Sequence, residues 1–338
     1  MIYDVIIVGS GPAGLTAAIY TTRASLKTLI IAGVKWGGQL QLTSLVENFP
    51  GFPEGIQGPD LMSNMRKQAE HHGAEIIEQE FVSGDFGNRP FKITTEDGKI
   101  YESKSVILAS GADARWLGVP GEEEKIGRGV SSCATCDAAF FKNKNVIVVG
   151  GGDSAMEEAL VLSKSSTNVF LVHRKNEFRA SQIMQDRVKE TKNIHVVFNS
   201  QITEVGGGFK VESVKLKTEP SDKSLLSKSL EELDKITLNG LFNAKTISKD
   251  ESSIIWELPI DGVFVAIGHI PNTKSFSGID LDEQGYIKVQ NHFHTNVEGV
   301  FVAGDVHDRQ YRQAITASGF GSAAALEAEK WLGMQNSS

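Results

Sequence analysis

Two glycine-rich segments, each between an apolar β-branched run and a helical stretch, constrain the fold of this 338-residue chain more than any other feature. The first, Gly9-Ser-Gly-Pro-Ala-Gly14, follows the run Asp4–Val8. The second, Gly150-Gly-Gly-Asp-Ser-Ala155, follows Asn145–Val149. In such a motif the first glycine permits a tight turn, the second lets a pyrophosphate approach the backbone, and the third small residue lets helix and strand pack closely. The order strand, loop and helix predicts two dinucleotide-binding units in an α/β protein.

Two dinucleotide units in one chain predict a flavin and a nicotinamide coenzyme that exchange a hydride. After the first unit, the run Leu29–Ala32 ends without the acid that usually binds a ribose 2′-hydroxyl, so ribose recognition there must come from elsewhere. After the second unit, the run Val169–Val172 leads into four basic residues: His173, Arg174, Lys175 and Arg179. A 2′-phosphate requires such a cluster, which predicts NADPH rather than NADH. The alternative is a solvated basic turn.

The composition limits the kind of protein. The chain has 34 Lys and Arg against 42 Asp and Glu, a net charge of −8, which argues against nucleic-acid binding because neutralising phosphates needs clustered cations. No apolar run approaches the ~20 residues of a membrane-spanning helix. The N-terminus enters a strand without the basic segment of a signal peptide. We therefore expect a soluble, cytoplasmic protein of two domains, without a metal site.

Both cysteines of the chain lie in one motif, Cys133-Ala-Thr-Cys136. A zinc site needs four ligands, and the chain has no further cysteine and no histidine pair at ligand spacing. A purely structural disulfide is unusual in the cytosol and would close too short a loop to stabilise the fold much. A reversible dithiol fits, because one thiol can resolve a mixed disulfide formed by the other. Asp137 follows directly and has two interpretations, a proton donor in thiol exchange or the cap of the next turn.

Three further apolar runs that end near glycine predict additional buried strands: Ser105–Ala109, Gly262–Ala266 and Gly299–Ala303. Asp305 follows the last of them, and a C-terminal helix is predicted from Arg312 to about Leu332. An acid between a strand end and a helix N-terminus can bind a ribitol or phosphate arm, or serve as an ordinary turn cap.

The segment Thr218–Ser253 is rich in Lys, Ser, Glu and Asp. Within it, Leu226, Leu230 and Leu233 fall on one helical face. We therefore predict an inserted amphipathic helix over Ser224–Lys235 with mobile flanks. A solvated surface segment is favoured over a docking site for a partner.

Taken together, the motifs resemble those of the low-molecular-weight, NADPH-dependent thioredoxin reductases of bacteria, fungi and plants. The resemblance covers nearly the whole chain and is carried by the two glycine-rich loops and six further segments: Gly37-Gly-Gln-Leu40, Glu47-Asn-Phe-Pro-Gly51, Cys133-Ala-Thr-Cys-Asp137, Ala266-Ile-Gly-His269, Gly304-Asp-Val306 and Tyr311-Arg-Gln-Ala-Ile315. A C-A-T-C-D segment just before the second nucleotide motif is specific to this family. In the related glutathione-reductase type, the cysteine pair lies in the first nucleotide unit.

The resemblance implies an α/β fold of two nested Rossmann-like domains. The FAD domain would be discontinuous, with residues 1–114 and 259–338, and the inserted NADPH domain, residues 115–258, would carry the cysteine pair. FAD would be held by Gly9, Ser10, Gly11, Pro12, Ala13, Gly14, Gln39, Asn48, Val82, Asp305, Arg312, Gln313 and Ala314. NADPH would be held by Gly152, Asp153, Ser154, Ala155, His173, Arg174, Lys175 and Arg179.

The activity that the resemblance implies is electron transfer from NADPH, through FAD and a Cys133–Cys136 disulfide, to oxidised thioredoxin, in support of redox homeostasis. It implies that Cys136 lies beside the flavin, that Cys133 attacks the thioredoxin disulfide, that Asp137 is the acid, and that the enzyme is a homodimer. The alternatives are a flavoprotein that reduces a peroxiredoxin, a small-molecule dithiol oxidase, and a nucleotide-binding redox sensor without turnover. The basic cluster argues against the oxidase, and the intact cysteine pair argues against the sensor.

Overall fold

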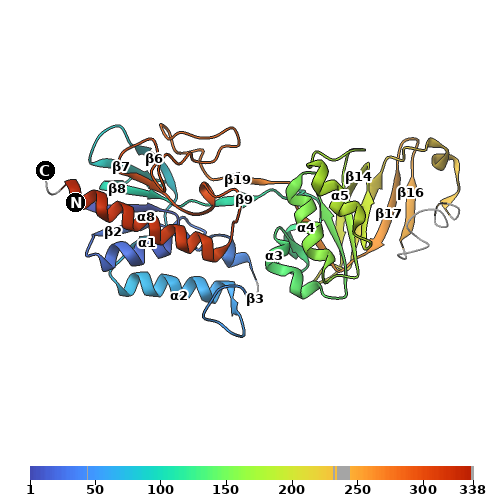
Figure 1. Cartoon of the computed structure of the whole chain (residues 1–338), viewed down its shortest axis with the longest axis horizontal. Helices are drawn as coiled ribbons and strands as arrows, with labels where there is room; N and C mark the ends of the chain where they lie inside the picture. Colours follow the sequence, from blue (N-terminus) through green and yellow to red (C-terminus); the bar gives the residue numbers. More distant parts are fainter. Residues whose placement is uncertain (44, 231–232, 234–243, 336–338) are drawn as a thin grey trace. The chain divides into compact units, whose positions relative to one another are not determined.

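The computed structural model describes residues 1–43, 45–230, 233 and 244–335, and Figure 1 shows its two compact units. Unit 1 contains Met1–Asp113 and His269–Ser338, and unit 2 contains Ala114–Gly268. The second break corrects the predicted boundary at 258/259. It lies at 268/269 because β18 (Gly262–Val265) pairs in parallel with β11 (Asn145–Val149) and so belongs to the sheet of unit 2.

Unit 1 is built on a seven-stranded sheet of order β5-β2-β1-β8-β7-β6, in which β20 also pairs with β8. Its strands are β1 (Ile2–Val8), β2 (Thr28–Ile31), β5 (Glu75–Ile77), β6 (Phe81–Asp85), β7 (Phe91–Thr95), β8 (Ile100–Leu108) and β20 (Val300–Val302). The strands β5, β2, β1, β8 and β20 are parallel, whereas β6 and β7 form an antiparallel hairpin on the first half of β8. The carboxyl ends of β1 and β20 therefore lie at the same edge, where the first glycine-rich loop and Asp305 follow.

Three helices cover one face of this sheet: α1 (Pro12–Arg23), α2 (Gly58–His71) and α8 (Ala314–Gln335). Val5 and Ile7 of β1 pack in the helical core, while Ile6 and Val8 pack in a second core with the β7 residue Phe91. Burial on both faces explains why the strand reads as a continuous apolar run. Short elements complete the unit: η1 (Gly38–Leu42), β3 (Leu45–Val46), β4 (Ile56–Gln57) and η5 (Gly304–Val306).

Unit 2 has a five-stranded parallel sheet of order β10-β18-β11-β12-β13. Besides β11 and β18, its strands are β10 (Val130–Ser131), β12 (Asn168–Val172) and β13 (Ile194–Val197). One of its cores joins the sheet to residues of four helical elements: α3 (Ala134–Asp137), η3 (Ala138–Phe141), α4 (Asp153–Ser163) and α5 (Gln182–Glu190). The short α3 carries the cysteine motif, and it packs against α4, which follows the second glycine-rich loop.

A four-stranded antiparallel sheet of order β14-β15-β17-β16 completes unit 2 and packs a second core against the parallel sheet. Its strands are β14 (Ser200–Gly206), β15 (Ser213–Thr218), β16 (Lys245–Lys249) and β17 (Ile254–Pro259). The unit also has the short η2 (Glu123–Lys125). The chain passes between the units at β9 (Ala112–Ala114) and β19 (His269–Pro271), which pair with each other.

The single helix predicted over Ser224–Lys235 is wrong in part. A 3-10 turn, η4 (Lys223–Ser227), ends at Lys228, where the Lys249 ammonium donates to the carbonyls of Leu226 and Lys228. Leu230 and Leu233 are helical, but Leu230 is exposed and Leu233 is buried, so the leucines do not share one buried face. Residues 231–232 and 234–243 lie outside the described residues, and β16 occupies part of the predicted flank.

Among the described residues, none of the helices combines the length and the apolar character that crossing a lipid bilayer requires. In the same ranges, no three His, Cys, Asp or Glu side chains are grouped so as to hold a metal ion.

Candidate active site

The three glycines of the first loop meet different surroundings. Gly9 has φ +110°, and a Cβ there would lie 2.2 Å from the Ala109 carbonyl oxygen; a Cβ on Gly14 would lie 2.0 Å from the Gly9 carbonyl oxygen. These two glycines are required by backbone packing. A Cβ on Gly11 would meet no atom within 4 Å. Gly11 therefore leaves open the space through which a phosphate can reach the backbone.

The N-terminus of α1 is suited to an anion. Gly11 is its N-cap, Pro12 begins the helix, and in the part of the chain that the structure describes no side chain caps it and its first turn has no acid. Its first N–H groups are thus available to a pyrophosphate, whose charge the helix dipole favours. The Ser10 hydroxyl is engaged within the protein rather than turned to a phosphate. Its Oγ donates to the Ala32 carbonyl (2.7 Å) and accepts the Gly37 N–H (2.9 Å).

The sequence shows no acid at the end of β2, but the structure places one there. Glu80, from the segment between β5 and β6, accepts the Val34 N–H through Oε1 at 2.7 Å. A Cβ on Gly33 would lie 3.3 Å from the same oxygen. A carboxylate at this place is what the generic fingerprint uses for a ribose. Glu80 is 46 residues from Val34 in the chain, so no local motif could reveal it.

Asp305, in η5, carries a buried oxygen without a partner. Its Oδ1 has no hydrogen-bond partner among the described residues. Burial raises the pKa of Asp305 to about 7; Asp308 adds to the rise, and Arg312 offsets part of it. A buried carboxyl that lacks a donor fits a hydroxyl group of a bound ligand. Beside it, Gly304 and Gly321 bring η5 and α8 close to α1, since a Cβ on Gly321 would lie 2.1 Å from the Ala13 carbonyl oxygen.

Hydrogen bonds hold several of the other predicted FAD residues in place. Asn48 donates to the Gln313 side chain at 3.3 Å, just before α8 begins at Ala314. Gln39 donates to the Ala112 carbonyl, and the Arg312 N–H donates to Asp308 at 3.0 Å. Val82 is exposed on the edge strand β6, and its place in the site stays a prediction. Together with the open loop at Gly11, these residues fit a flavin dinucleotide.

The second loop repeats the geometry of the first. A Cβ on Gly150 would lie 2.5 Å from the Ala266 carbonyl oxygen and 2.6 Å from the Ala155 Cβ, so these two positions are required by packing. Gly152 occupies the same motif position as Gly11, and a Cβ there would again meet no atom within 4 Å. Gly152 is the N-cap of α4, with no capping side chain in the described ranges. Both loops therefore open at their second motif glycine.

The basic cluster after β12 contains three exposed cations rather than four. Arg174, Lys175 and Arg179 are exposed, and within the described residues none of them forms an ion pair. The Arg179 N–H donates to the Gly151 carbonyl at 2.7 Å, which ties the cluster to the loop. Asp153 is exposed and accepts two hydrogen bonds from Ser181, which fixes the start of α5.

His173 differs from the other three residues of the predicted basic cluster because it is buried, and its place in the NADPH site stays a prediction. It is buried, with its ring against Gly151, where a Cβ would lie 2.2 Å from Cε1. Burial lowers the pKa of His173, and the cations Arg179 and Arg174 lower it further, so the ring is neutral near pH 7. The ring packs against the loop at Gly151. Its Nε2 has no hydrogen-bond partner in the described part of the chain.

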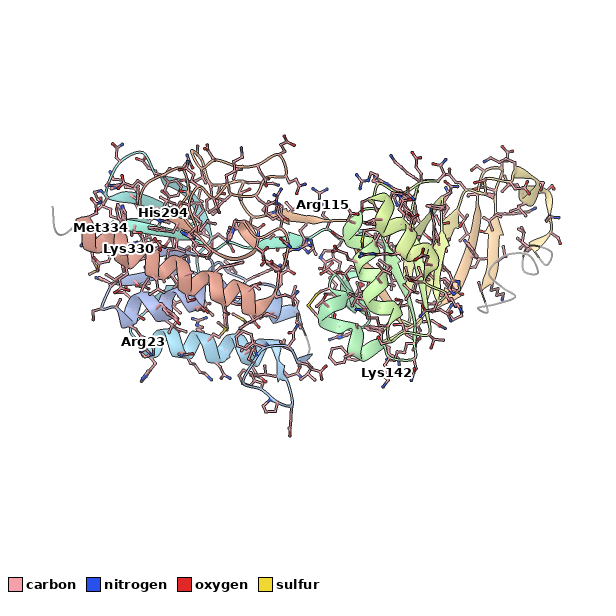
Figure 2. The ribbon with its side chains drawn as sticks, viewed as in Figure 1. Arg23, Arg115, Lys142, His294, Lys330 and Met334 are labelled. Atoms are coloured by element: carbon pink, nitrogen blue, oxygen red, sulfur yellow. A yellow bond between two sulfur atoms is a disulfide. The ribbon has the colours of Figure 1, made fainter. Side chains whose placement is uncertain are left out.

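Cys133 and Cys136 form a disulfide at the start of α3, with their Cα atoms 5.3 Å apart (Figure 2). Cys133 is the N-cap of α3, and its sulfur accepts the Cys136 N–H at 3.2 Å. The Cys133 N–H donates to the Ser131 hydroxyl at 3.0 Å, and the Ala134 N–H donates to the Glu158 carboxylate of α4. A sulfur at a helix N-cap is stabilised as a thiolate once the disulfide opens.

Asp137 ends α3, one residue after Cys136. It also occupies the N-cap position of η3, yet among the described residues its side chain makes no capping hydrogen bond there, which removes the capping interpretation. Burial raises the pKa of Asp137, and a hydrogen bond with Ser131 offsets part of the rise. A carboxyl whose pKa is raised keeps its proton at higher pH and can donate it to a nearby thiolate.

A model of the pyridine nucleotide-disulphide oxidoreductases matches residues 3–321. The chain belongs to this family. Over 337 residues it is 45% identical to a thioredoxin reductase of Mycolicibacterium smegmatis. This alignment covers 99% of this chain and 98% of the relative. It is 43% identical to a Mycobacterium leprae protein named bifunctional thioredoxin reductase/thioredoxin, covering 98% of this chain and 66% of that protein.

Solved structures agree with these matches. A thioredoxin reductase from Giardia duodenalis has a TM-score of 0.84 at 40% identity, with 98% of this chain and 99% of that chain covered. One from Streptococcus pyogenes has a TM-score of 0.85 at 34% identity, with the same coverage. The predicted α/β fold of two Rossmann-like parts and the predicted resemblance are thereby confirmed. The Cys133–Cys136 pair fits the redox-active disulfide of such enzymes, and the two open loops fit the FAD and NADPH that this family uses.

Proposed function

We propose that the chain reduces the disulfide of thioredoxin with electrons from NADPH, and that the residues described above hold the groups that do so. The observation that carries the proposal is the Cys133–Cys136 disulfide on α3, in the same unit as the second glycine-rich loop. The Mycobacterium leprae relative, whose name joins both activities, supports thioredoxin as the acceptor. A homodimer, which the resemblance implies, and a cytoplasmic location, which the sequence predicts, stay predictions.

The direct test is spectroscopic and kinetic. The purified protein should absorb as a flavoprotein, and its NADPH consumption should require oxidised thioredoxin. Equal NADPH consumption with and without thioredoxin would instead indicate an oxidase and would overturn the proposal.

The cofactors divide between the two loops. FAD, when bound, accepts a hydride from NADPH and supplies an electron pair to the disulfide. Gly11 and the N-terminus of α1 would receive its pyrophosphate, and Asp305 would accept a hydrogen bond from one of its hydroxyls. Gly152 and the N-terminus of α4 would receive the pyrophosphate of NADPH, with Arg174 and Arg179 at its 2′-phosphate.

The reduced cysteine pair then exchanges with the substrate. The Cys133 thiolate attacks one sulfur of the thioredoxin disulfide, forming a mixed disulfide and releasing the other sulfur as a thiolate. Asp137 donates a proton to a leaving thiolate. The Cys136 thiolate attacks the Cys133 sulfur, which releases reduced thioredoxin and restores the Cys133–Cys136 disulfide. The N-cap position of Cys133 supports its role as the attacking sulfur.

We expect Arg174→Ala to raise KM for NADPH by roughly 10-fold or more, because a charge-assisted hydrogen bond contributes about 1.5–3 kcal/mol. NADH, which lacks the 2′-phosphate, should be used as well as before. Steady-state kinetics with both coenzymes would measure the difference. Lys164→Ala removes one positive charge from the opposite end of α4 and should leave the KM values for NADPH and NADH unchanged. Equal losses for NADPH and NADH would contradict the assignment.

We expect Asp137→Asn to slow thioredoxin reduction by roughly 10²-fold near pH 7, the lower end of the range for general acid catalysis. In the wild type, the rate should fall as pH rises through the raised pKa of Asp137, because the carboxyl then loses the proton it donates. Asp137→Asn should remove this limb of the profile. Ser131→Ala removes the hydrogen bond that lowers the pKa of Asp137 and should move the limb to higher pH. An unchanged limb in Asp137→Asn would exclude the acid role.

A further inference from the structure

The short helix α3 holds two acceptors at its first turn. The Cys136 N–H donates to the Cys133 sulfur at 3.2 Å, and the Ala134 N–H donates to Oε2 of Glu158. Glu158 reaches α3 from α4, 24 residues further along the chain. A carboxylate therefore lies at the backbone of the residue that follows the attacking cysteine.

This arrangement changes when the disulfide opens. In the disulfide the Cys133 sulfur is neutral, so the Glu158 carboxylate at the Ala134 N–H faces no negative charge on that sulfur. After reduction, a Cys133 thiolate and the Glu158 carboxylate are both anions bound to neighbouring amides of one four-residue helix. Like charges so placed disfavour ionisation, so Glu158 raises the free energy of the thiolate.

We propose that Glu158 is a positioning residue that holds the first turn of α3 and keeps the cysteine pair strongly reducing. A dithiol whose thiolate is less stabilised returns to the disulfide more readily and gives its electron pair to a substrate disulfide more readily; stabilising the reduced form has the opposite effect. The inference rests on the proposed exchange at Cys133 and deepens it, since it assigns the residue that sets the direction of electron flow.

The other charged groups near the pair lie differently. Asp137, on α3 itself, interacts with Ser131. On α4, Asp153 is exposed and accepts hydrogen bonds from Ser181. Glu157, also on α4, is exposed. The element η3 carries no charged residue, and Lys142, which follows it, is exposed. Of these carboxylates, that of Glu158 accepts a hydrogen bond from an amide of the cysteine turn.

The test uses Glu158→Gln, whose amide oxygen can still accept the Ala134 N–H while its charge is gone. The flavin-loaded protein is equilibrated with mixtures of reduced and oxidised dithiothreitol, quenched and alkylated. Because the chain has two cysteines, alkylation reports only this pair. We expect the equilibrium to shift about tenfold toward the dithiol, a rise in potential of about 30 mV for a two-electron couple. Glu157→Gln, at the preceding residue of α4, removes an equal charge and should leave the equilibrium unchanged.

A second measurement isolates Cys133. In a Cys136→Ser background the only thiol is Cys133, and Glu158→Gln should move its rate of reaction with iodoacetamide to lower pH. Glu158→Asp retains the charge and should stay near the wild-type equilibrium even where the shorter side chain loosens the turn. No shift in Glu158→Gln relative to Glu157→Gln, or a shift toward the disulfide, would overturn the inference. Thioredoxin is absent from both measurements, so failure here is distinct from failure of the proposed function.

Discussion

Cys133→Ser is expected to reduce thioredoxin turnover by a factor on the order of 10³ or more, the scale of loss when an enzyme loses its covalent nucleophile. FAD should stay bound, because the residues proposed to hold it lie in the other unit. If Cys136 lies beside the flavin, as the resemblance implies, its remaining thiolate should produce a long-wavelength absorption band. Absorbance and NADPH-coupled thioredoxin reduction measure both effects.

Cys136→Ser should give the complementary result. Turnover should be lost to a similar extent, but Cys133 can still attack, and without a resolving thiol the mixed disulfide with thioredoxin should accumulate on a non-reducing gel. Thr135→Ser, an exposed position between the cysteines that keeps both sulfurs, should behave as the wild type. If Cys133→Ser traps thioredoxin and Cys136→Ser does not, the two roles are reversed.

The features that could be predicted from the sequence are those determined locally. Each glycine-rich loop follows a strand and opens a helix within a dozen residues, so its geometry depends on neighbours in the chain. The cysteine motif likewise forms its disulfide across a separation of three residues. Backbone sterics at a tight turn leave few alternatives, and a local pattern is then enough.

The features that could not be predicted depend on contacts between distant segments. Glu80 reaches the end of β2, and Glu158 reaches α3, and neither pairing leaves a motif in the sequence. The sequence places His173 in a basic cluster with three exposed cations, but the structure buries it against Gly151, and this burial lowers its pKa. The boundary at 258/259 failed because an apolar run does not say which sheet its strand joins; β18 joins β11.

The equivalence of Gly11 and Gly152 leads to the second large effect. Both have an extended backbone with negative φ, −70° and −104°, which alanine also adopts. A Cβ at either would meet no protein atom within 4 Å, so Gly→Ala should leave the fold intact and only obstruct an approaching pyrophosphate. We expect Gly152→Ala to raise KM for NADPH by roughly 10²-fold, the loss of about two charge-assisted hydrogen bonds. FAD content and thermal stability should not change.

Gly11→Ala should have the opposite pattern, with FAD lost on purification and NADPH affinity retained, because the two loops belong to different units. Flavin absorbance and NADPH titration of each variant separate the two effects.

Gly150→Ala is the contrasting control: a Cβ 2.5 Å from the Ala266 carbonyl oxygen forces the loop away from the end of β18, so the melting temperature itself should fall. If Gly152→Ala destabilises the protein as much as Gly150→Ala, the open space at Gly152 is not reserved for a ligand. If Gly152→Ala binds NADPH normally, the pyrophosphate does not approach the backbone there, and the symmetry between the loops has no functional meaning.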